Sequence, residues 1–189
     1  MKSKQLEYGL ELDPNACYKM ESIHNQSKEN FESVVNWLYL GADLYDNGYA
    51  KIGLTMGDLR TRSSSSANPN FYIFCAFKCK SNITKPEINE IEKNALKYLE
   101  RLFIYDNGST KRASHADSGR MSECFYHIDF IEVFTEFHNY LYDHYANYFN
   151  RAGFESYPDV YEGEYLFCQF TDRISQDETN RYIRMLLQN

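Results

Sequence analysis

The chain contains no run of about 18 apolar residues, which is the length that a membrane-spanning helix requires. Its amino terminus also lacks the basic and then apolar pattern of a secretory signal. The five cysteines are odd in number and irregularly spaced, which favours reduced thiols over a disulfide framework. We therefore expect a soluble, unexported protein of the cytoplasm that does not enter membranes.

Several common catalytic motifs are also missing. There is no glycine-rich phosphate loop, no Ser-His-Asp order and no dinucleotide-binding fingerprint. Cysteine and histidine form only short-spaced pairs, Cys75 with Cys79 and Cys124 with His127, and a zinc site would require these pairs to converge. Since cysteine is a common core residue, a structural role is the simpler interpretation of both pairs.

The composition is that of a globular protein with many aromatic residues. The 189 residues suffice for one domain with a core, and 43% of them are hydrophobic. The 17 Tyr and 13 Phe suit either a core or a wet groove, because a tyrosine ring carries a polar end. The net charge of −7 argues against nucleic acid as a partner. However, residues 51–120 hold 12 Lys or Arg against 7 Asp or Glu, which permits a basic face on an acidic body.

The region around residue 47 predicts a β-hairpin. Residues 36–44 are rich in β-branched and aromatic side chains, and residues 49–54 would form the returning strand. Asp46-Asn47-Gly48 between them is a strong turn signal, because Asn and Gly tolerate positive φ. The side-chain period of two places one set of residues on the same face of the second strand: Tyr49, Lys51 and Gly53.

Two helices carry clear start signals. Thr84 and Glu87 predict a capping box, and apolar residues then recur at helical spacing until Asp106-Asn107-Gly108 ends the helix. Asp129 predicts the cap of a second helix, for which Gly153 is the expected end. The other expected elements are a short helix over 58–62, a strand over 71–79, a polar and basic loop over 109–122, a strand over 123–126, a strand over 165–170 and a helix over 177–187.

This order of elements predicts an α+β, or mixed α/β, fold. A small central sheet of about three strands, mainly antiparallel because hairpin strands must be, would be flanked by helices. We expect an N-terminal arm over residues 1–30 and a main domain over residues 31–152. A C-terminal extension of helix and strand, residues 153–189, would pack on that domain.

Four residues with useful chemistry follow one another along the chain: Tyr39, Lys51, Arg62 and Glu123. They supply a phenol, two cations and a carboxylate, the groups needed for metal-assisted cleavage of a phosphodiester. An ammonium near a phenol lowers its pKa from about 10 and makes it a better general base. A guanidinium offers a planar fork of donors to the charge that builds at phosphorus, and a carboxylate can hold a divalent cation.

The motifs around these residues resemble those of a nuclease family. Trp37-Leu38-Tyr39 and Lys51-Ile52-Gly53 are similar to the two signature elements of the GIY-YIG nuclease superfamily, and most similar to its phage-type branch with a Lys-Ile-Gly second element. Arg62 stands where the family's helical arginine is expected. Ser122-Glu123-Cys124-Phe125 resembles the later element that carries the metal-binding glutamate. The resemblance covers roughly residues 36–130.

The resemblance implies a DNA endonuclease with one Mg²⁺ or Mn²⁺ per active site, located in the host cytoplasm if a phage encodes it. Tyr39 would be the general base assisted by Lys51, Arg62 would stabilise the transition state, and Glu123 would hold the metal. The chain departs from the family at Trp37, which replaces the first glycine, and at Lys51, which replaces the second tyrosine. Tyr49, on the same strand face as Lys51, is the candidate replacement phenol.

Other residues and other functions stay open at this point. Five basic residues could track phosphates or could be a plain solvated surface: Arg60, Lys111, Arg112, His115 and Arg120. The first alternative function is a catalytically inactive nuclease fold that binds nucleic acid or a protein. The second is a small interaction protein, such as an inhibitor of host defence. Symmetric cleavage of both strands needs two sites, so a homodimer is a further open expectation.

Overall fold

A computed structural model describes residues 36–57, 59, 68–156 and 160–188 of this protein. The elements in chain order are β1 (Trp37–Asp43), β2 (Ala50–Thr55), β3 (Phe71–Lys78), α3 (Lys85–Leu102), β4 (Arg112–Ser114), β5 (Met121–Phe125), α4 (Phe130–Tyr145), the 3₁₀ turn η1 (Ala146–Tyr148), β6 (Arg151–Ser156), β7 (Val160–Leu166), β8 (Cys168–Phe170) and α5 (Gln176–Leu186). None of the helices in these ranges has the length and apolar character needed to cross a bilayer.

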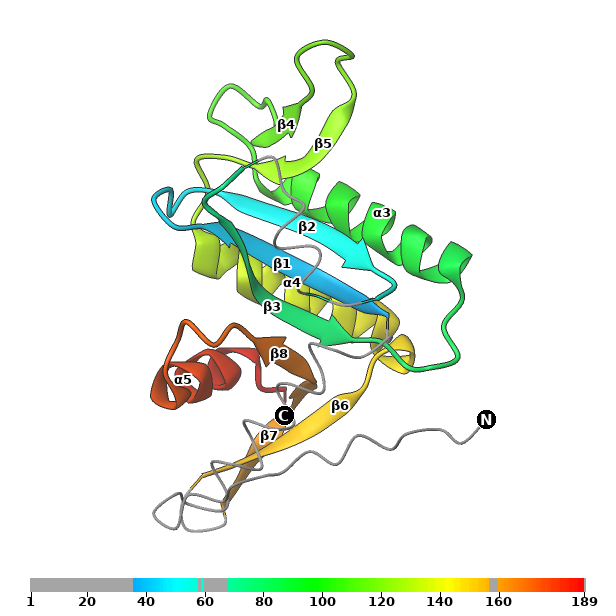
Figure 1. The fold of residues 1–189 in the computed structure, drawn as a ribbon, viewed down its shortest axis with the longest axis vertical. Helices are drawn as coiled ribbons and strands as arrows, with labels where there is room; N and C mark the ends of the chain where they lie inside the picture. The colour runs from blue at the N-terminus through cyan, green and yellow to red at the C-terminus, as the bar shows by residue number, and fades with distance from the viewer. Residues whose placement is uncertain (1–35, 58, 60–67, 157–159, 189) are drawn as a thin grey trace, which may run out of the picture.

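The architecture is mixed α+β around an antiparallel sheet, as predicted, but the sheet is larger than expected. It has six strands in the order β4-β5-β2-β1-β3-β8, while β6 and β7 form a separate two-stranded ladder that projects from the body (Figure 1). The expected number of about three strands was wrong because β5 pairs with β2 and because β4 and β8, of three residues each, extend the two edges. Such short edge strands are defined by their partners and carry no periodicity of their own.

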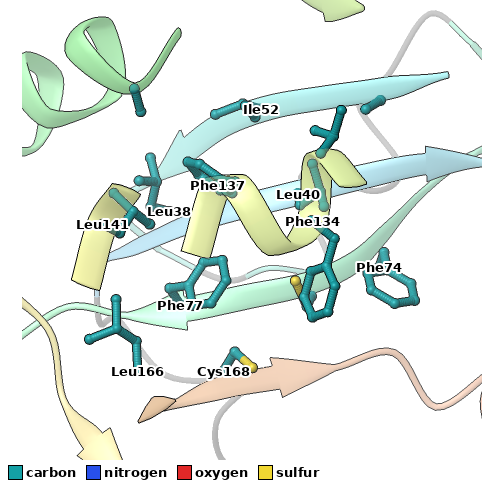
Figure 2. Packing of buried hydrophobic residues seen from close by; sticks show 14 of the residues in the cluster. Leu38, Leu40, Ile52, Phe74, Phe77, Phe134, Phe137, Leu141, Leu166 and Cys168 are labelled. Atoms are coloured by element: carbon teal, nitrogen blue, oxygen red, sulfur yellow. The ribbon is translucent and has the colours of Figure 1, made fainter. Parts of the chain in front are cut away.

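The main core lies between one face of the sheet and the helices α3 and α4. Leu38 and Leu40 of β1 and Ile52 of β2 meet Phe134 and Phe137 of α4 in this layer (Figure 2). All five side chains are fully buried, so the predicted alternation along the hairpin is confirmed for its helix-facing side. The opposite faces of β1 and β2 therefore remain available for the candidate site.

The helix start signals of α3 and α4 are confirmed, whereas both helices end earlier than predicted. Thr84 and Glu87 form both hydrogen bonds of a capping box, and the Asp129 side chain accepts from two backbone N–H groups at the start of α4. α3 ends at Leu102 and α4 at Tyr145. Gly153, the expected end of α4, lies in β6 opposite Glu164 of β7. A cap is a local interaction, whereas these ends depend on where the chain next finds a strand partner.

The C-terminal segment completes the main sheet. β8 pairs with β3 through Cys75↔Phe170 and Phe77↔Cys168, and buried residues of α5 join the main core. The expected single strand over residues 165–170 is interrupted at Phe167, where β7 gives way to β8. The expected loop over 109–122 instead contains β4 and the start of β5, paired as a hairpin.

A buried histidine joins α4 to β7. His138 is fully buried, and its Nε2 accepts a hydrogen bond of 3.0 Å from the backbone N–H of Leu166. Burial lowers the pKa of His138 to about 4, although a hydrogen bond to Asn139 and the charge of Asp143 act in the opposite direction. The folded protein therefore holds this ring neutral over the pH range in which an unfolded chain would protonate it.

This histidine predicts a loss of stability in acid. The contribution of neutral His138 is fully present above pH 6.5, its unfolded pKa, and is lost as the pH falls toward 4. We expect about 3 kcal/mol of the free energy of unfolding to disappear between pH 7.5 and pH 4 because of this residue. Urea titrations at several pH values should show a smaller pH-dependent loss for His138→Gln, which keeps an acceptor, than for the exposed-site control His144→Gln. Equal pH dependence in the two variants would contradict this assignment.

Candidate functional site

The candidate site lies on the sheet face turned away from α3 and α4. A second, smaller cluster of buried residues covers this face: Trp37, Tyr39, Tyr49, Leu59, Phe71, Ile73 and Ala76. Strand alternation places these side chains opposite the main core. The face is therefore built mainly from β1, β2 and β3, the strands that the sequence patterns identified most directly.

Tyr39 lies over a glycine of the neighbouring strand. The antiparallel register pairs Tyr39 with Gly53, and a Cβ atom added to Gly53 would overlap the phenol oxygen of Tyr39. The ring is 4% exposed and makes an edge contact with Phe71 at 6.4 Å between ring centroids. The glycine of the Lys-Ile-Gly element thus provides the space in which the phenol oxygen sits.

Lys51 lies on the same face of β2, two residues before Gly53. Its Nζ is 3.6 Å from Oε2 of Glu123 and 5.7 Å from the ring centroid of Phe71. Gly41, the partner of Lys51 on β1, has no side chain, and the Phe71 ring fills the space where its Cβ would be. Phe71 therefore contacts both Tyr39 and Lys51 and joins them into one cluster.

Glu123 reaches this cluster through the pairing of β5 with β2. The register Lys51↔Cys124 brings the adjacent Glu123 alongside the lysine, with side chains that are 26% exposed for Lys51 and 47% exposed for Glu123. An exposed ion pair of this kind contributes at most about 1 kcal/mol to stability. The ion pair matters here because it holds a solvent-accessible carboxylate, that of Glu123, beside Lys51.

The donor set is compatible with magnesium but not with an all-protein metal cage. In the ranges described, no group of three or more His, Cys, Asp or Glu side chains converges to hold a metal ion. Magnesium often keeps several waters and binds through one or two carboxylates together with phosphate oxygens of a substrate. A single accessible carboxylate at Glu123 fits this mode of binding.

Tyr49 is less suited to act as a base than an ordinary tyrosine. It is buried, its hydroxyl lies 3.3 Å from the Cys124 Sγ atom, and its ring packs on Tyr126. Burial is the main cause that raises the pKa of Tyr49 well above its usual value, and the hydrogen bond to Cys124 raises it further. These contacts favour a packing role that ties β2 to β5.

Arg112 connects strands and is not an open phosphate contact. Its Nε donates to the Ser122 carbonyl at 2.6 Å, its Nη1 pairs with Glu100 of α3 at 2.7 Å, and its side chain is 11% exposed. Through Ser122 it anchors the strand that carries Glu123. This positioning role was not predicted, and the only signal for it in the sequence is Glu100, twelve residues before the arginine.

The remaining basic residues that could track phosphates are Arg60, Lys111, His115 and Arg120. Lys111 lies with its Nζ 5.8 Å from the Tyr105 ring centroid, whereas His115 and Arg120 are exposed on the β4–β5 hairpin, with the His115 N–H bonded to the Arg120 carbonyl. Arg60 and Arg62 lie outside the described residues. The structure therefore brings Tyr39 and Lys51 to one sheet face and pairs Lys51 with Glu123 of β5, and the position of Arg62 stays a prediction.

The remaining feature that sequence analysis missed is Phe71, which was assigned only to a strand. Its contacts with Tyr39 and Lys51 depend on two glycines, Gly41 and Gly53, that leave space on neighbouring strands. Two glycines within otherwise bulky strands were the signal for such a close approach.

Comparisons of the chain with protein-family models, with curated proteins and with solved structures gave no match.

Proposed function

We propose that this protein is a metal-dependent endonuclease that hydrolyses phosphodiester bonds in DNA. The observation that supports this most strongly is that Tyr39 and Lys51 share one face of the sheet and that the Lys51 Nζ lies 3.6 Å from a carboxylate oxygen of Glu123. These residues come from three strands, and Glu123 follows Lys51 by 72 residues and Tyr39 by 84 residues along the chain. A cation and a carboxylate of the kind that a phosphodiester hydrolase uses are therefore paired in space although distant along the chain.

Each residue has a defined task in this proposal. Tyr39 accepts a proton from the attacking water, and the Lys51 ammonium, which shares the Phe71 ring with Tyr39 as a neighbour, favours the phenolate form of that tyrosine. Glu123 holds Mg²⁺ or Mn²⁺, which when bound neutralises charge on the leaving oxygen. Arg62, from the segment after β2, donates to the non-bridging phosphate oxygens. Arg112 keeps β5 in place and so positions Glu123.

The direct test is a cleavage assay with the purified protein. We expect nicking of supercoiled plasmid or degradation of single-stranded DNA in Mg²⁺ or Mn²⁺, and full loss of cleavage in EDTA. Glu123→Gln should reduce the rate at least about 100-fold, because the metal loses its only charged protein ligand in this proposal. The matched control is Glu155→Gln, an exposed carboxylate on β6, which should leave the rate unchanged. DNA that stays intact with both metals would contradict the proposal.

A second candidate is a nucleic-acid-binding or protein-binding module without chemistry. Two observations favour it, namely the low exposure of Tyr39, 4%, and the raised pKa of Tyr49. Such a module would shift a fluorescent oligonucleotide, or bind a protein partner, while leaving DNA intact in every metal. Sedimentation of the protein with and without DNA would also show whether two copies assemble, as symmetric double-strand cleavage requires.

A further inference from the structure

A separate pocket opens beside the β1–β2 turn and carries chemistry that the proposed nuclease does not use. Its volume is about 510 Å³, and it is formed by that turn, the start of α4, and aromatic residues of β3 and α5. A volume of this size lies within the range of small-molecule sites and exceeds that of a single side chain. Tyr49 is the residue that this pocket shares with the candidate catalytic face.

The pocket has aromatic walls held in fixed positions. Phe74 makes edge contacts with Phe130 at 5.0 Å and with Tyr182 at 5.1 Å between ring centroids. Tyr72, two residues before Phe74 in β3, also lines the pocket. These rings belong to β3, α4 and α5, so three elements define the wall. The face of an aromatic ring carries partial negative charge and attracts cations.

The polar side of the pocket carries only carboxylates as charged groups. Asp43, Asp46 and Asp129 line it, and no Lys, Arg or His is among its described lining residues. Backbone N–H groups hold each carboxylate in place: Asp46 accepts from Gly48, and Asp129 accepts from Ile131 and from its neighbour. The carboxylate of Asp43 is bonded through both oxygens, and these hydrogen bonds lower its pKa.

The chain itself already places a cation on one of these rings. The guanidinium carbon of Arg173 lies 5.6 Å from the ring centroid of Tyr72. Arg173 is not among the residues that line the pocket. The three lining carboxylates therefore face no basic side chain within the lining. The contact is an example, within this chain, of a flat, delocalised cation lying against a ring of the pocket wall.

We propose that this pocket binds an organic cation in which an amidinium or guanidinium group is attached to a flat apolar body. The apolar body would lie among Phe74, Phe130 and Tyr182, and the cation would face Asp46 and Asp129. Such a group occurs in free small molecules and in arginine side chains of peptides. This binding is independent of the proposed nuclease activity, and its test uses no cleavage assay.

Benzamidine and its neutral isostere benzamide are the matched probes. Titration of the ¹⁵N-labelled protein with benzamidine should shift the amide signals of Gly48, Tyr72 and Ile131, and benzamide should bind at least tenfold more weakly. The double variant Asp46→Asn and Asp129→Asn should weaken benzamidine at least tenfold. Asparagine retains the acceptor oxygen at both positions, so the turn and the helix cap are preserved. Glu155→Gln on the distant strand β6 removes one exposed carboxylate away from the pocket, and as the control it should bind as the parent does (Figure 1).

The same titration with a blocked Phe-Arg dipeptide identifies the source of the cation. Tighter binding of the dipeptide than of benzamidine indicates a peptide partner, and weaker binding indicates a free small cation. The proposal is overturned if benzamide binds as well as benzamidine or if the shifted amides lie outside the pocket. It is also overturned if no shift occurs at about 10 mM probe, a concentration that would detect a Kd on the order of 1 mM. The contrast between the two probes on the parent protein also keeps the test decisive if the double variant does not fold.

Discussion

Replacing Tyr39 with Phe is expected to reduce DNA cleavage by a factor of about 10² to 10⁴, the usual contribution of a positioned general base. The substitution removes the phenol oxygen and keeps the ring that packs against Phe71. The rate constant should fall while DNA binding stays close to that of the parent, because the lost interaction acts on the proton and not on the phosphates. Single-turnover cleavage and fluorescence anisotropy with the same oligonucleotide separate these two quantities.

Two further variants distinguish chemistry from packing. Tyr45→Phe removes a phenol that is 83% exposed in the β1–β2 turn and should leave the rate unchanged. Gly53→Ala keeps the Tyr39 hydroxyl but places a methyl group where its oxygen lies, so cleavage should fall although every proposed catalytic group is present. A Tyr39→Phe protein that folds normally and cuts at the parental rate would exclude this tyrosine as the base.

Truncation of Phe74 to Ala is expected to lower the free energy of unfolding by about 3–5 kcal/mol. Its ring is 3% exposed and makes edge contacts with four other rings: Phe130, Phe134, Phe170 and Tyr182. These rings come from α4, β8 and α5, so the loss affects the contact between the C-terminal segment and the main sheet. Aromatic pairs of this geometry add to the cost of the cavity.

Urea denaturation measures this effect, with Tyr45→Ala as the control because it truncates an aromatic ring at the surface. The control should change the free energy of unfolding by no more than about 0.5 kcal/mol. Phe74→Leu should lie between the two, because it restores part of the buried volume. A loss below about 1 kcal/mol for Phe74→Ala would contradict the tight aromatic packing described for this cluster.

Local signals in the sequence predicted the parts of the structure that local interactions determine. The turn at Asp46-Asn47-Gly48 sets the hairpin register, and that register pairs Tyr39 with Gly53 and Gly41 with Lys51. The capping residues Thr84 and Asp129 mark helix starts because their side chains bond to backbone groups two or three residues away. These features require no knowledge of distant partners.

Features that depend on distant partners were missed. β4 and β8 are recognisable only beside β5 and β3, and β6 replaced the expected last turns of a helix because β7 lies next to it. The same limit applies to the candidate site. Lys51 and Glu123 are useful together only because β5 pairs with β2, and nothing in either motif specifies that pairing.

Local patterns were enough to predict the hairpin, the helix starts, the α+β class and the residues with useful chemistry. The six-stranded sheet, the burial of Tyr49 against Cys124 and the approach of Glu123 to Lys51 become visible in the folded protein alone. The physical reason is the range of the interactions: turns and caps form between residues a few positions apart, whereas sheet order is chosen by burial of the whole core.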